Sequence, residues 1–100
     1  MKRLTLLVLF SMLMAPFSSV TLAGGVKVGT LFDNSGALKD WGPRQQNAAE
    51  LAAQQMAAAG FTIEFFLEDS QTAAEPAKIA ARKLIETDKV AVIIGSSSSG

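Results

Sequence analysis

Four consecutive serines lie where this chain could bind a ligand. They follow five apolar residues, 90–94, and are flanked by Gly95 and Gly100. The apolar run predicts a short strand buried on both faces, as in a parallel sheet. Ligands of open α/β sheets bind beyond the carboxyl ends of the strands, where hydroxyls and backbone N–H groups suit an anion such as a carboxylate. Residues 96–100, here called the serine loop, are therefore a candidate binding site. A flexible linker is the weaker interpretation, because the loop directly follows a buried strand.

Two adjacent carboxylates, Glu68 and Asp69, form a second candidate functional site. They follow another predicted strand, and paired carboxylates can transfer protons or hold a metal ion. No further ligand or base converges on them in the sequence. We therefore favour a solvated loop in which Asp69 or Ser70 bonds nearby backbone groups.

Composition excludes several other chemistries. The chain has no cysteine, so it has no disulfide and no thiolate metal site, and it has no histidine, the commonest general base and metal ligand. Ser97–Ser99 could offer a nucleophile, but no histidine or cysteine supports them. Residues 29–36 (GTLFDNSG) do not match the G-x-G-x-x-G pattern of dinucleotide-binding sites. Nine basic and nine acidic residues form no charged patch that would bind nucleic acid. We expect a binding protein that is not an enzyme, with no catalytic residue, metal or cofactor.

The first 23 residues are predicted to be a cleaved signal peptide. Lys2 and Arg3 precede an apolar run over residues 4–14, Pro16 interrupts it, and small residues lie before Gly24. The apolar run is about half of the ~20 residues that a membrane span needs, which disfavours an anchor. Without the two leader bases, the net charge of the remaining chain is −2.

Strands and helices are predicted to alternate after the leader. The expected elements are strands at residues 25–32, 61–68 and 90–94 and helices at residues 43–59 and 74–87. This order predicts an α/β fold with right-handed βαβ crossovers and a parallel sheet. The half-polar strand 61–68 is expected nearer a sheet edge than the wholly apolar strand 90–94.

Several local features refine this prediction. Gly29 within the first strand indicates a close approach by another group, more often a packing contact than a ligand. The sequence Asp-Asn-Ser-Gly at residues 33–36 is typical of a turn. The helix faces expected to lie against the sheet contain Ala49, Ala52, Ala53 and Met56 in the first helix, and Ala77, Ala80, Ala81, Leu84 and Ile85 in the second.

The sequence after the leader resembles the start of a periplasmic solute-binding protein of the leucine/isoleucine/valine-binding type. Four stretches carry the resemblance, in order: VKVGTLFDNSGALKDWG at 26–42, NAAELAAQQMAAAG at 47–60, EDSQ at 68–71 with AARK at 80–83, and VAVIIGSSSSG at 90–100. Two positions depart from the family pattern. A proline usually opens the second helix where this chain has Ala74, and the aromatic residue before Gly42 is often tyrosine but here is Trp41.

The resemblance implies a type I periplasmic-binding-protein (Rossmann-like) lobe. Residues 24–100 would be the N-terminal part of the first of two lobes, with the C-terminal remainder absent. The family binds branched-chain or related small amino acids in the periplasm and delivers them to the permease subunits of ABC transporters. Ser99 matches the serine that binds the ligand's carboxylate or ammonium group, Ser98 and Gly100 supply neighbouring backbone, and Trp41 matches the aromatic residue at the cleft mouth. The alternative is the ligand-binding ectodomain of a membrane receptor or sensor with the same fold.

Overall fold

A computed structural model describes residues 25–99 of the chain, so the predicted leader lies outside the described residues. The element order is β1 (Val26–Phe32), α2 (Gly42–Ala58), β2 (Ile63–Asp69), α3 (Ala74–Glu86) and β3 (Val92–Gly95). The predicted α/β class and βαβαβ order are confirmed. No helix within residues 25–99 has the length and apolar character needed to cross a membrane.

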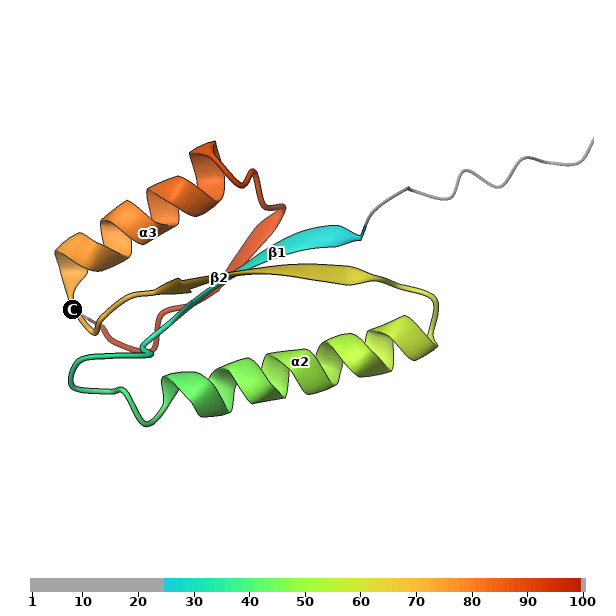
Figure 1. Ribbon diagram of the computed structural model, residues 1–100, viewed down its shortest axis with the longest axis horizontal. Helices are drawn as coiled ribbons and strands as arrows, with labels where there is room; N and C mark the ends of the chain where they lie inside the picture. Colours follow the sequence, from blue (N-terminus) through green and yellow to red (C-terminus); the bar gives the residue numbers. More distant parts are fainter. Residues whose placement is uncertain (1–24, 100) are drawn as a thin grey trace, which may run out of the picture.

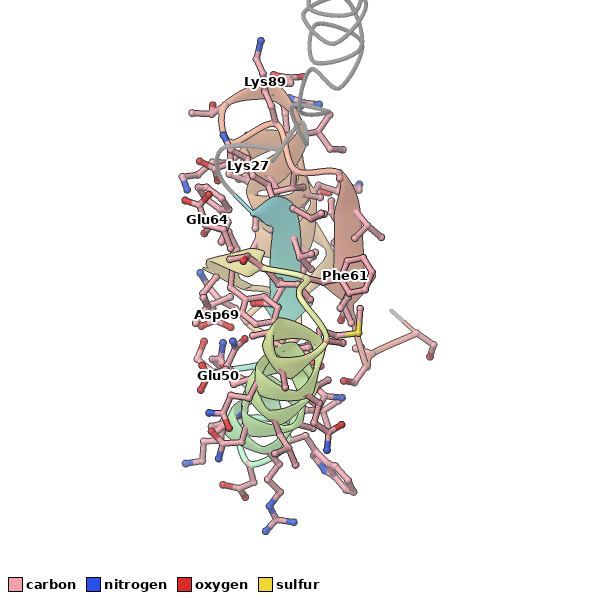
Figure 2. All side chains as sticks on the ribbon, turned by 90° about the vertical axis from the view of Figure 1, so that its right-hand side faces the viewer. Lys27, Glu50, Phe61, Glu64, Asp69 and Lys89 are labelled. Atoms are coloured by element: carbon pink, nitrogen blue, oxygen red, sulfur yellow. The ribbon has the colours of Figure 1, made fainter. Side chains whose placement is uncertain are left out.

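The three strands form one parallel sheet with β1 at its centre. The order is β2-β1-β3, and β1 pairs with both neighbours in parallel register, with Val28 opposite Phe65 on one side and Val92 on the other. Helices α2 and α3 cover opposite faces of the sheet (Figure 1). Figure 2, turned by 90°, shows β1 between its two neighbours and the helices at opposite ends of the view. α2 and α3 each run from the carboxyl end of one strand back across the sheet to the start of the next strand.

The face of the sheet under α3 carries one part of the apolar core. Leu84 is fully buried and packs with Leu31 and Ala80. Gly29 makes this contact possible, because a Cβ atom there would lie 3.0 Å from both Leu84 methyl carbons. The predicted packing role of Gly29 is thus confirmed. Ile85 and Ile79 on the same helix are 60% and 71% exposed, so placing Ile85 on the buried face was wrong.

The face under α2 combines two buried apolar side chains of β1, Val28 and Phe32, with a polar contact. Thr30 on β1 donates a hydrogen bond of 2.8 Å to Oε1 of Gln46, and both side chains are buried. The helix begins close to the sheet because Gly42 has no side chain: a Cβ atom there would lie 2.4 Å from the Asp33 carbonyl oxygen. The predicted face was only partly right, since Ala52 and Met56 are exposed while Ala49 and Ala53 are half-buried.

The prediction that strand 90–94 is buried on both faces was wrong. β3 lies at an edge of the described sheet, and Val92 and Ile94 are 51% and 45% exposed on the α2 side. Only Ile93, on the opposite face, packs against the core beneath α3. Among the described residues, α2 packs against β1 and β2 and leaves Val92 and Ile94 half-exposed, so the apolar pattern of β3 exceeds what these residues cover.

Candidate ligand-binding site

The carboxyl ends of all three strands lie at one edge of the sheet. Because the strands are parallel, the loops after β1, β2 and β3 gather there, beside the first turns of both helices (Figure 1, left). The serine loop follows β3 at this edge, and Asp33 and Ser70 follow β1 and β2. This is the edge at which open α/β sheets bind ligands.

A buried carboxylate joins the three strand ends. Asp33 is 0% exposed and accepts hydrogen bonds from the Ser70 hydroxyl, from the Ser96 hydroxyl at 3.2 Å and from the Ser97 backbone N–H at 3.2 Å. Buried charges are costly unless hydrogen bonds compensate them, and here three donors do so. The start of the serine loop is thereby fixed to the end of β1.

A second carboxylate, that of Asp69, fixes the loop after β1. Its Oδ1 accepts the backbone N–H groups of Asn34, Ser35 and Gln71 at 3.0, 3.2 and 2.8 Å, and its Oδ2 accepts the Ser35 hydroxyl at 2.7 Å. Thr72 adds to this contact by donating to the Ser35 carbonyl oxygen at 2.9 Å. The expected bonding of nearby backbone is confirmed for Asp69 and also for Ser70, whose hydroxyl accepts the Thr72 N–H at 3.3 Å. Ser70 is nevertheless buried and not solvated.

The pKa of Asp69 lies below its ordinary value. Desolvation raises it, but the bonds from the Ser35 hydroxyl and from the amides of Gln71, Asn34 and Ser35 lower it by more. Asp69 is therefore ionised at neutral pH and acts as an acceptor. The described residues contain no cluster of three or more His, Cys, Asp or Glu side chains that could hold a metal ion, either at Asp69 or elsewhere.

The first turn of α2 contacts the serine loop from the other side. Gln45 donates from its side-chain amide to the Ser97 hydroxyl. Its Oε1 is buried and has no hydrogen-bond partner among the described residues. Because the neighbouring Gln46 is fixed to β1 by Thr30, the helix holds Gln45 in a defined position.

A cavity of about 180 Å³ lies between the serine loop and the first turns of α3. It is lined by Ser96 and Ser98 from the loop and by Ala73, Ala74, Ala77 and Lys78 from the helix. Ala73 at the N-cap provides no side-chain cap. Because Pro76 has no N–H and the Ala77 N–H donates to the Ala73 carbonyl oxygen, the first-turn amides that another acceptor could use are those of Ala74 and Glu75. Helix N-termini carry partial positive charge and favour anions. The arrangement can bind a small anionic group through hydroxyl and amide donors.

Of the residues predicted to bind the ligand, only some lie at this cavity. Ser98 lines the cavity, whereas Ser99 is exposed beside it in the chain, and Gly100 lies outside the described residues. Trp41 is 56% exposed at the N-cap of α2, in the chain segment that follows β1. The structure brings Ser98 to the cavity with Ser96, which the sequence prediction did not single out.

Asp33 and Gln45 were also missed from the sequence. Asp33 was interpreted only as part of a turn, although it directly follows β1 and strand-end carboxylates face the site edge. The position of Asp33 directly after β1 could have indicated a role at the site. The three groups that donate hydrogen bonds to it, however, belong to segments far from it in the sequence. Gln45 had no signal of its own, since the sequence of its helix contains several glutamines.

Comparisons with known proteins agree with this architecture. Residues 25–100 match a family model described as periplasmic binding protein. The fold resembles the crystal structure of the branched-chain amino acid transporter substrate binding protein LivJ from Streptococcus pneumoniae str. Canada MDR_19A, in complex with isoleucine. The TM-score is 0.68 and the sequence identity is 28% over 74% of this chain and 22% of that one. No curated protein matched the chain.

The three parallel strands in βαβαβ order match part of a periplasmic binding protein lobe. The family match covers most of the sequence, and the chain belongs to the periplasmic binding protein family. This is a family of binding proteins that are typically not enzymes. The chain spans about a fifth of the length of the LivJ structure it resembles.

Proposed function

We propose that this protein is the extracytoplasmic substrate-binding component of an ABC transporter and binds a branched-chain or related small amino acid. The observation that carries the proposal is the cavity between the serine loop and the uncapped N-terminus of α3, in a chain of this family. The resemblance to LivJ, which was crystallised with isoleucine, supports the ligand class.

The chemistry of the cavity suits the carboxylate of an amino acid. Serine hydroxyls and first-turn amides are donors, and hydrogen bonds to an ionised acceptor are about twice as strong as neutral ones. Lys78 lines the cavity but pairs with Glu75 at 2.8 Å, so it adds little net charge. In the proposal, Ser98, Ser99 and Gly100 bind the charged end of the ligand, and Trp41 covers its apolar side chain.

The whole protein is proposed to have an exported, two-lobed organisation. Residues 1–23 act as a signal peptide that directs export to the periplasm, and residues 24–100 begin the first of two lobes. The ligand lies between the lobes, and the loaded protein docks on the permease subunits of the transporter.

Calorimetric titration of the full-length protein with isoleucine, leucine and valine tests the proposal. We expect Ser99→Ala to weaken binding by roughly ten- to a hundredfold, because a hydrogen bond to a charged group contributes ~1.5–3 kcal/mol. Thr87→Ala is the matched control, since it removes an exposed hydroxyl at the far end of α3. No binding of any of the three amino acids, or equal losses in both variants, would refute the proposal.

A further inference from the structure

The serine loop leaves the sheet at an exposed edge strand, so something other than strand packing must fix its path. β3 is short, lies at the edge of the described sheet and has half-exposed apolar side chains. Ser96 and Ser97 are themselves exposed. A loop with so little burial needs specific hydrogen bonds to hold one conformation.

Two side chains supply them: Gln45 bonds the Ser97 hydroxyl, and Asp33 bonds the Ser96 hydroxyl and the Ser97 N–H. One carboxylate oxygen accepts the Ser96 hydroxyl and the other accepts the Ser97 N–H, each at 3.2 Å. Ser96 in turn accepts the N–H of Ser98 on its hydroxyl oxygen at 3.3 Å. The bonds therefore run from the buried end of β1 through Ser96 to the part of the loop that lines the cavity.

The charge of Asp33 also limits how it can move. The carboxylate is fully buried, and the Ser70 hydroxyl at the end of β2 bonds the same oxygen that Ser96 does. Releasing the loop would leave a buried charge short of two donors, which is costly. The anchored loop is thus favoured before any ligand arrives.

We propose that Asp33 is a positioning residue that preorganises the serine loop for ligand binding. It does not contact the ligand itself but orients Ser96 and, through it, the backbone at Ser98. The inference rests on the proposed function for its effect on affinity. Its effect on the loop itself is independent of any ligand.

Two readouts on the full-length protein test the proposal. The first is hydrogen–deuterium exchange at the Ser97 amide without ligand, and the second is isoleucine affinity by calorimetry. Asp33→Ala should speed Ser97 exchange by about tenfold or more and weaken isoleucine binding by a similar factor. Asp33→Asn should stay within about threefold of the original in both, because an amide of the same shape keeps an acceptor and the serine hydroxyls can accept from its NH₂ group.

Asp88→Ala is the matched control. Asp88 is also a largely buried carboxylate that receives a side-chain donor, Lys83 at 3.1 Å, but it precedes β3 at the opposite end of the strand. This variant should leave Ser97 exchange unchanged even if it lowers stability. If Asp33→Ala does not fold, Asp33→Ser serves instead, since its hydroxyl is polar but one atom too short to reach Ser97.

The results of these measurements distinguish the positioning role of Asp33 from the proposed ligand-binding function. Unchanged Ser97 exchange in the disruptive Asp33 variant, or equal acceleration by Asp88→Ala, would overturn the positioning role. Faster exchange with undiminished isoleucine affinity would also overturn it, because the loop would then be ordered for no effect on binding. If the unmodified protein binds no isoleucine, the proposed function fails, while the exchange measurement still decides whether Asp33 orders the loop.

Discussion

The buried pair of Thr30 and Gln46 offers a quantitative test of how α2 is fixed to the sheet. Thr30 is 1% exposed and Gln46 is 8% exposed, and the hydroxyl donates to Oε1 at 2.8 Å. Thr30→Val keeps the shape of the side chain but leaves a buried amide oxygen without this donor. Such a group costs ~1–3 kcal/mol, so we expect the free energy of unfolding to fall by about that amount.

A double-mutant cycle isolates the hydrogen bond. Gln46→Met keeps the length of the side chain and removes the acceptor, together with a bond of 3.2 Å to the exposed Glu50. Replacing both partners by apolar groups of similar shape can be nearly neutral, so the double variant should be more stable than the sum of the single losses predicts. Urea denaturation of the full-length protein measures all four stabilities. A coupling energy near zero would refute the assignment of this bond as the link between α2 and β1.

Three further predictions concern packing, pH and processing. Gly29→Ala should lower the free energy of unfolding by ~1–3 kcal/mol, because the new methyl group would press on Leu84; an unchanged urea midpoint would contradict this. Because the pKa of Asp69 is lowered in the folded state, its stabilising contribution is present above the unfolded pKa of about 3.9 and is lost as pH falls through the folded value. NMR titration should show the Asn34 amide losing its hydrogen bond only in that acidic range, and not at all in Asp69→Asn. Mass spectrometry of exported protein should find an N-terminus at or near Gly24, and an intact Met1 would contradict the leader.

The order of elements was predictable because local signals agree with the global fold. Pro43 lies in the first turn of α2, Gly60 follows its end, and alternating apolar residues mark β1 and β2, so the boundaries in the structure lie close to those expected. The exposure of β3 was not predictable in the same way. The sequence of an apolar strand indicates that its faces need to be covered. It does not indicate which elements cover them, because that depends on the tertiary structure.

The candidate site was predictable in place but not in its contacts. The serine run marked the correct edge of the sheet because that inference depends only on strand direction. The role of Asp33 depends on donors from Ser70 and Ser96, which are distant in sequence and meet only when three parallel strands end together. From its residue type alone, Asp33 was interpreted as a turn-forming residue. In the folded structure it is also a hydrogen-bond acceptor for the serine loop.

A crystal structure of the full-length protein with isoleucine tests the central claim most directly. We predict that the ligand's carboxylate lies in the cavity between the serine loop and the first turn of α3, within hydrogen-bond distance of Ser98 or Ser99. The loop should keep the contacts to Asp33 that it makes without ligand. Isoleucine bound elsewhere, with the cavity at Ser96 and Ser98 containing only solvent, would contradict the account.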